Sequence, residues 1–256
     1  MFWSKKKKKM PDFLIIGAQK SGTTSLYNYL IQHPNIYAAI QKEIHYFDSK
    51  FDKPKEWYGE CFPSLKTDEE HITGEATPYY IFHPLAPIRI KKMIPKSKII
   101  ILLRNPIDRA FSHYHHAVRN LGETMTFENA IEKESERLRG ELEKFYENPY
   151  YHSYNYQHFS YLKRGIYVDQ LEVWYSLFPR KQILVLEYEN FFGDLPASMG
   201  IVCEFLEVSM HSFECKPLNV GKYTKMAPET RVGLRAYFEP HNQRLYRYLG
   251  RTYNWK

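Results

Sequence analysis

Cysteine is scarce in this chain, with three residues among 256, at Cys61, Cys203 and Cys215. An odd and widely spaced set predicts neither a disulfide framework nor a zinc site. This excludes the class of small domains that depend on disulfides or structural metals. We expect the three thiols to be packing or surface groups.

Long apolar runs are also missing. No run approaches the roughly 20 residues that a helix needs to cross a bilayer. The first apolar run, Phe13 to Ile16, follows a lysine stretch but is too short for the apolar core of a secretory signal. The sequence therefore predicts a soluble, cytoplasmic protein without a transmembrane segment.

Outside one short stretch the chain has little excess charge. The formal net charge is +7, and Lys5 to Lys9 supply five positive charges, which leaves about +2 for the rest. This distribution predicts no nucleic-acid partner. We expect residues 1–10 to form a basic flexible tail and residues 11–256 to form one domain. The functional alternative for the tail is a weak contact of Lys5 to Lys9 with a membrane surface or an anionic polymer.

What the chain does have is an alternation of apolar runs and helical patterns. Continuous apolar runs at 13–16, 98–103 and 182–186 are typical of strands covered on both faces, and a shorter strand is expected at 72–74. Helical patterns lie at 83–94, 106–119, 127–145, 167–178, 195–206 and 228–249. The alternation predicts an α/β fold with a central, mostly parallel sheet flanked by helices. Ligands bind such sheets at the carboxyl ends of the strands.

The stretch from Phe13 to Leu30, FLIIGAQKSGTTSLYNYL, predicts an anion site. A strand is followed by a loop with Gly17 and Gly22, and then by the start of a helix. Glycine lets the backbone approach a ligand closely, and a helix start presents free N–H groups and a positive dipole end. The alternative is an ordinary turn between a strand and a helix that happens to hold two glycines and a lysine.

This loop differs from the GxxxxGK[ST] motif of ATP- and GTP-binding proteins. Thr23 stands where that motif has lysine, and the lysine of this chain, Lys20, lies three residues after Gly17. Lys20 can neutralise a 5′-phosphate, but the Lys-Ser/Thr pair that serves magnesium and a γ-phosphate is missing. The pattern therefore argues against an ATP/Mg-dependent kinase.

A second anion element follows the predicted strand 98–103. Arg104 lies at the carboxyl end of that strand, and Ser112 lies about two helical turns further along the next helix. Arginine can hold a phosphate with two hydrogen bonds, and serine adds a donor. On the same sheet edge as the first loop, the pair predicts a ligand with two separated phosphate-like groups.

The segment Gln41 to Asp48, QKEIHYFD, is the candidate for a catalytic base. In an extended segment, Glu43 and His45 project to the same side. A carboxylate beside Lys42 or His45 can be tuned as a general base. The alternative is a polar loop with ordinary ion pairs.

Together these motifs resemble those of the PAPS-dependent sulfotransferases, which use 3′-phosphoadenosine 5′-phosphosulfate. The motifs are QKSGTTSLYNYL, LLRNPIDRAFSHYHH, KEIHYFD, GEATPYY, RGIYVDQLEVWYSLFP and YFEPHNQRLYRYLGRTYNW. KEIHYFD and GEATPYY resemble the branch that contains the heparan sulfate 3-O- and N-sulfotransferase domains and bacterial homologues. The resemblance implies a single P-loop-like domain that transfers a sulfuryl group from PAPS, releases PAP and needs no metal.

The resemblance also assigns roles to residues. Glu43 matches the catalytic base, Lys20 would stabilise the leaving group, and His45 would tune or position Glu43. Lys222 matches a late lysine near the cofactor, although Tyr223 stands where animal members often have glycine. The residues matched to the cofactor are Lys20, Ser21, Gly22, Thr23, Thr24, Ser25, Arg104, Ser112, Lys222 and Tyr223.

The acceptor is less sharply defined by the sequence. The branch implies a carbohydrate or glycolipid hydroxyl or amine, and a small hydroxylated molecule is the alternative. The Tyr- and His-rich segment 146–161 is expected to be irregular and either stacks on an acceptor or packs internally. Lys42, Glu75, Thr77 and His115 are the candidates for the acceptor cleft. A non-catalytic nucleotide- or glycan-binding module is the rival to an enzyme, and the sequence does not predict the oligomeric state.

Overall fold

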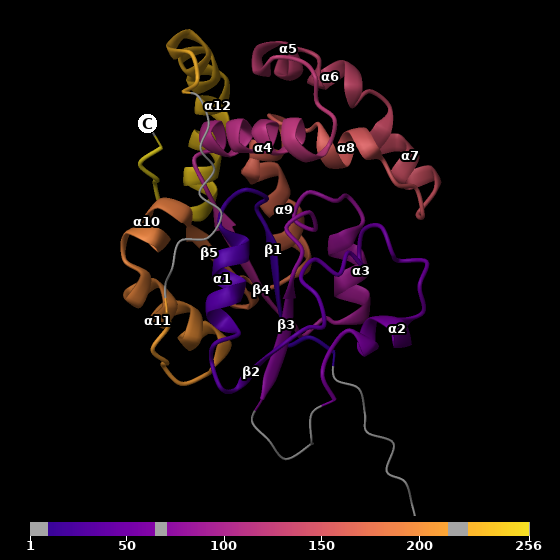
Figure 1. The fold of residues 1–256 in the computed structure, drawn as a ribbon, viewed down its shortest axis with the longest axis vertical. Helices are drawn as coiled ribbons and strands as arrows, with labels where there is room; N and C mark the ends of the chain where they lie inside the picture. Colours follow the sequence, from indigo (N-terminus) through magenta and orange to yellow (C-terminus); the bar gives the residue numbers. More distant parts are fainter. Residues whose placement is uncertain (1–9, 65–70, 215–224, 256) are drawn as a thin grey trace, which may run out of the picture.

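The computed structural model describes residues 10–64, 71–214 and 225–255. The lysine run 5–9 and the predicted cofactor residues Lys222 and Tyr223 therefore lie outside the described residues. Within them, five strands form one sheet in the order β2-β3-β1-β4-β5, and every neighbouring pair is parallel (Figure 1). The strands are β1 (Phe13–Gly17), β2 (Ile36–Ala38), β3 (Ile72–Ala76), β4 (Lys98–Leu103) and β5 (Ile183–Glu187). The predicted α/β fold with a parallel central sheet is confirmed.

The central strands are apolar along their whole length because helices cover both faces of the sheet. Leu14 and Ile16 of β1 pack on one side, in the core that includes α3 (Ala86–Met93) and α9 (Tyr167–Leu177). Phe13 and Ile15 pack on the other side, in the core that includes α1 (Thr23–Leu30) and α11 (Leu195–Leu206). Successive side chains of a strand point to opposite faces, so each face receives alternate residues of the same apolar run.

The other helices differ in part from the predicted ones. The predicted helix 228–249 is α12, and the predicted helix 106–119 is α4, which extends one residue further. The charged stretch 127–145 is broken into short helices because Gly140, in a left-handed conformation, and Lys133 interrupt it. The strand β2 and the helices α2, α8 and α10 were not predicted, and α8 lies in the segment 146–161 that was expected to be irregular. The remaining helices are α2 (Lys55–Glu60), α4 (Pro106–Asn120), α5 (Phe127–Glu132), α6 (Glu134–Arg137), α7 (Glu141–Glu147), α8 (Tyr154–His158), α10 (Tyr188–Gly193) and α12 (Pro228–Leu249), with the 3₁₀ turns η1 (Lys163–Gly165) and η2 (Arg180–Gln182).

The carboxyl ends of the strands form the edge that matters for function. Figure 1 shows the helices from α4 to α8 lying beyond this edge, like a cap over the end of the sheet. Backbone hydrogen bonds fix the loops that leave it: the N–H of Ala18 donates to the carbonyl of Leu102 at 2.8 Å, and the N–H of Thr77 donates to that of Ile15 at 3.1 Å. None of the described helices is long and apolar enough to span a membrane.

Candidate active site

The loop between β1 and α1 has the shape of an anion cradle. Gly22 precedes the helix with φ of +82°, and an added Cβ there would lie 2.6 Å from the Phe192 ring. Both observations require glycine. Within the described part of the chain, no side chain caps the start of α1. The N–H groups of its first turn are therefore available to a ligand.

The polar side chains of this loop are arranged for the same purpose. Lys20 has a left-handed backbone with φ of +69°. Ser21 is fully buried, and its Oγ has no hydrogen-bond partner among the described residues. Thr23 and Ser25 are also buried, and Thr24 is half-buried. A buried hydroxyl without a partner is costly, so the loop is suited to receive a group that accepts hydrogen bonds.

The second anion element adjoins the first. Nη1 of Arg104 donates to the backbone carbonyl of Lys20 at 3.0 Å. The Arg104 guanidinium lies 4.8 Å from the centre of the Tyr188 ring. The backbone carbonyl of Arg104 accepts a hydrogen bond from the hydroxyl of Tyr167 at 2.8 Å. Ser112 is buried on α4. The structure thus brings the loop after β1 and the loop after β4 together, as their positions in the sequence predict.

Positive charges converge on Lys20. Burial lowers the pKa of its ammonium group, and the charges of Arg119 and Arg104 lower that pKa further, while the Glu43 carboxylate raises it. Positive charges this close repel one another, and a bound anion would offset that repulsion. The electrostatics of the site therefore fit the phosphate-like groups that the sequence predicts.

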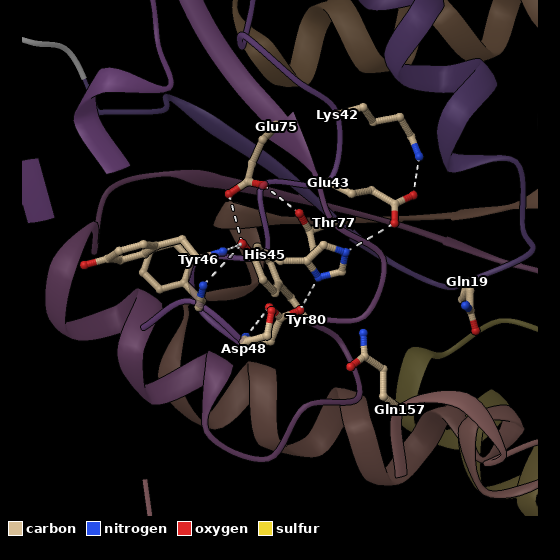
Figure 2. A network of polar contacts seen from close by, with 12 residues as sticks. Gln19, Lys42, Glu43, His45, Tyr46, Asp48, Glu75, Thr77, Tyr80 and Gln157 are labelled. Atoms are coloured by element: carbon tan, nitrogen blue, oxygen red, sulfur yellow. Dashed lines mark hydrogen bonds and ion pairs between the residues drawn. The ribbon is translucent and has the colours of Figure 1, made fainter. Parts of the chain in front are cut away.

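Glu43 lies in a chain of charged contacts (Figure 2). One carboxylate oxygen pairs with the ammonium of Lys42, and the other lies 3.5 Å from Nε2 of His45. On its other side, Nδ1 of His45 donates to Oδ2 of Asp48 at 2.7 Å. The Asp48 side chain is fully buried, whereas that of Glu43 is 38% exposed. Asp48 is therefore an internal anchor for His45, and Glu43 is partly exposed to solvent.

The pKa values follow from these contacts. Burial alone would raise the pKa of Glu43, but the hydrogen bond from His45 and the charge of Lys42 lower it to about 2. Burial would lower the pKa of His45, but its bonds to Asp48 and Glu43 raise it to about 10. At neutral pH, Glu43 is a carboxylate and His45 is an imidazolium held between two carboxylates.

Backbone strain is concentrated at this site. Three of the described non-glycine residues with positive φ lie at this site: Lys20 at +69°, Glu43 at +59° and His45 at +61°. Left-handed backbone is unfavourable for such residues and persists only where the surroundings impose it. The N–H of Glu43 donates to the carbonyl of Ala76 at 3.2 Å, which ties this segment to the end of β3. The strained conformations support a functional role for the three residues.

Two of the predicted acceptor residues are placed elsewhere by the structure. Glu75 and Thr77 are fully buried, so neither contacts an acceptor in this conformation. The Glu75 carboxylate accepts from the hydroxyls of Tyr58 and Thr77 at 2.6 Å each and from that of Tyr80 at 3.2 Å. Burial raises the pKa of Glu75. Glu75 and Thr77 therefore belong to the buried polar network of the protein interior.

A contact of His115 with the acceptor stays a prediction. The His115 ring packs edge-on against Phe111 at 4.4 Å between centroids. The neighbouring His116 is the one that interacts with the site: burial lowers its pKa, and the charges of Lys20 and Arg119 lower it further. The sequence carried a signal for His116 and Arg119, since both lie at helical spacing from Ser112 on one face of α4.

Lys42 remains a candidate for acceptor contact, because its ammonium pairs with the partly exposed carboxylate of Glu43. Among the described residues, no group of three or more His, Cys, Asp or Glu side chains is arranged to hold a metal ion.

The parallel sheet and the paired anion loops define an α/β protein with a P-loop-like fold. Comparison with known proteins gives the family: residues 10–226 match the sulfotransferase domain, and the chain belongs to the sulfotransferase family. The resemblance that the motifs indicated and the enzyme class that they predicted are both confirmed at this level.

Individual relatives agree with this assignment. The chain is 28% identical to the membrane-associated sulfotransferase kil1 of Dictyostelium discoideum, over 96% of this chain and 67% of that protein. It is 29% identical to human heparan sulfate glucosamine 3-O-sulfotransferase 3B1, over 97% of this chain and 65% of that protein. The chain thus spans about two thirds of the length of these relatives. A crystal structure of a sulfotransferase from Alicyclobacillus acidocaldarius superposes with a TM-score of 0.78 at 33% identity, covering 96% of this chain and 98% of that one.

Proposed function

We propose that this protein transfers a sulfuryl group from PAPS to an acceptor hydroxyl or amine by in-line displacement. One observation carries the proposal: Lys20, Arg104 and Glu43, from three different loops, meet at the carboxyl edge of the sheet, with Arg104 bonded to the backbone of Lys20 at 3.0 Å. PAPS, when bound, supplies the sulfuryl group and departs as PAP.

The residues present suit PAPS. The uncapped start of α1, the unpartnered Ser21 hydroxyl and the charge of Lys20 match the 5′-phosphosulfate. Arg104 and Ser112 match the 3′-phosphate. Lys20 and the loop N–H groups would stabilise the negative charge that grows on the leaving phosphate, the kind of electrostatic support that often contributes about 10²–10³ in rate.

Glu43 is the proposed general base. Its depressed pKa keeps it ionised across the neutral range, so it is always ready to accept a proton. Its proton affinity is low while Lys42 is paired with it, and a general base works best with a pKa near the working pH. An acceptor hydroxyl that takes the place of the partly buried Lys42 at Oε1 would raise the pKa of Glu43 at the moment a base is needed. His45 and Asp48 hold the carboxylate in place.

For the acceptor we propose a carbohydrate or glycolipid. Support comes from the name of the human relative, which acts on a glucosamine of heparan sulfate, and from the similarity of the base segment to that branch. A location in the cytoplasm, a weak membrane contact by Lys5 to Lys9 and a reaction without a metal remain predictions.

The experiment is an incubation with radiolabelled PAPS and a panel of glycans, glycolipids, alcohols and phenols, read by mass gain of one sulfuryl group. ATP with Mg²⁺ serves as the parallel donor. Sulfuryl transfer from PAPS and no phosphoryl transfer from ATP is the expected result. Binding of PAP without any transfer would favour a non-catalytic module, and phosphoryl transfer would favour a kinase.

A further inference from the structure

The short helix α8 carries a half-buried polar side chain, Gln157, for which the reaction described above has no use. The carboxamide oxygen of Gln157 is shielded from solvent and has no hydrogen-bond partner within the described part of the chain. An unpartnered buried amide carbonyl costs about 1–3 kcal/mol. Figure 2 shows this side chain extending from α8 toward Glu43 and His45.

The position of Gln157 is fixed by a buried arginine. Arg164 is 2% exposed, and its Nη2 donates to the backbone carbonyl of Gln157 at 2.6 Å. Its Nη1 donates to the amide oxygen of Gln19, the residue before Lys20 in the anion loop. The guanidinium also lies 4.8 Å from the centre of the Tyr79 ring. One rigid group therefore joins α8 to the loop that is matched to PAPS.

The electrostatics of the residue next to Gln157 agree with the view in Figure 2. Burial lowers the pKa of His158, the neighbour of Gln157, to about 4, and the charges of Arg164, His116 and His45 contribute to the same lowering. His45 bonds to Glu43, and the charge of Glu43 acts on His116. Together with the view in Figure 2, these interactions place the end of α8 beside the space in front of the base.

A neutral carboxamide in that space selects a particular chemistry. The amide nitrogen of Gln157 points toward His45 in Figure 2 and can donate to an oxygen atom of a ligand there. A turn of the amide would bring its oxygen, which has no partner among the described residues, to an O–H or N–H of the same ligand. An alcohol with a single hydroxyl gives that hydroxyl to Glu43 and has nothing left for Gln157. A sugar offers a second hydroxyl beside the first.

We propose that Gln157 is a specificity residue that binds a second hydroxyl of the acceptor, next to the hydroxyl that is sulfated. The acceptor class is then a polyhydroxyl compound, such as a sugar ring with adjacent hydroxyls. This inference rests on the proposed function and extends it from the reaction to the choice of acceptor.

The test compares paired acceptors with the 256-residue chain and PAPS: octyl β-D-glucopyranoside against 1-octanol, and cis-cyclohexane-1,2-diol against cyclohexanol. The measured quantity is the ratio of kcat/KM between the members of each pair. In Gln157→Leu, which keeps the size but removes the hydrogen bonds, the ratio is expected to fall about tenfold, the effect of one lost hydrogen bond to substrate. Gln243→Leu, which removes an exposed carboxamide on α12, is the matched control and is expected to leave the ratio unchanged.

Calorimetric titration with PAP separates the ways in which the test can fail. A wild type that neither binds PAP nor transfers a sulfuryl group refutes the proposed function itself. A wild type that binds PAP but does not prefer the polyhydroxyl members, or transfers to none of them, overturns the role of Gln157. So does an unchanged ratio in a folded Gln157→Leu that binds PAP normally, and Gln157→Ala replaces that variant should it fail to fold.

Discussion

Replacing Asp48 by Asn changes the charge around His45 with little change in shape. The Asp48 carboxylate is fully buried and accepts from Nδ1 of His45 at 2.7 Å and from the N–H of Ser49. It lies on the far side of His45 from Glu43. Asp48→Asn therefore leaves Glu43 and its surroundings in place while removing one of the two carboxylates that hold the imidazolium.

The expected magnitude follows from that contact. A hydrogen bond to a charged group contributes about 1.5–3 kcal/mol, and one pH unit of pKa corresponds to about 1.4 kcal/mol. The pKa of His45, raised to about 10 in the intact protein, is therefore expected to fall by about one to two pH units in Asp48→Asn. The charged His45 ring lowers the pKa of Glu43. In the variant, His45 loses its proton at a lower pH, so Glu43 loses this charged neighbour at a lower pH as well.

The assay is an NMR titration of the His45 ring protons, together with unfolding by urea at a series of pH values. Folding raises the pKa of His45, so the charged ring stabilises the folded state fully below its unfolded pKa of about 6.5. That stabilisation is lost as the pH rises toward about 10. The variant is expected to lose stability over a narrower window, which ends one to two pH units lower.

Asp52→Asn is the control, because Asp52 is 59% exposed and lies 3.8 Å from the ammonium of Lys53 at the surface. It removes the same charge and is expected to leave the titration of His45 unchanged. A His45 that titrates near 6.5 in the intact protein, or that keeps its pKa in Asp48→Asn, would refute the electrostatic chain from Asp48 to Glu43.

Three further substitutions test other parts of the site. Arg104→Met removes the charged hydrogen bonds that we propose to the 3′-phosphate and should weaken PAP binding about tenfold to a hundredfold by calorimetry. Unchanged affinity would remove Arg104 from that site. Gly22→Ala places a Cβ against the Phe192 ring at a left-handed φ and should lower the free energy of unfolding by about 1–2 kcal/mol or more. Wild-type stability and PAP affinity in this variant would contradict the need for glycine. Glu75→Gln leaves a buried amide among hydroxyl donors and should lower the free energy of unfolding in urea by about 1–3 kcal/mol, with PAP affinity retained. Loss of PAP binding without loss of stability would show that Glu75 acts directly in the site.

Much of the fold could be predicted because its strands and helices carry strong local signals. The run Lys98 to Leu103 is apolar throughout, and it is the strand β4. Proline at the start marks α4, α11 and α12. β2 has three residues, of which Tyr37 and Ala38 are exposed, so neither its length nor its pattern distinguishes it from a loop.

The site could be predicted in part for a similar reason. In a parallel sheet the loops after different strands meet at one edge, so the contact between Lys20 and Arg104 follows from their places after β1 and β4. The burial of Glu75 could not be foreseen, since its partner Tyr58 belongs to the unpredicted helix α2. Nothing in the local sequence indicates that Glu43 adopts left-handed backbone, because tertiary contacts impose that conformation.

The central claim is that Glu43 takes the proton of the acceptor while Lys20 and Arg104 hold the cofactor. The most direct measurement is the single-turnover rate of sulfuryl transfer from PAPS by Glu43→Gln, with PAP affinity determined on the same sample. The predicted result is a rate lower by about 10²–10⁴ with PAP binding retained, because the amide keeps the shape of Glu43 but cannot accept the proton. A near-normal rate in a variant that binds PAP would contradict the claim.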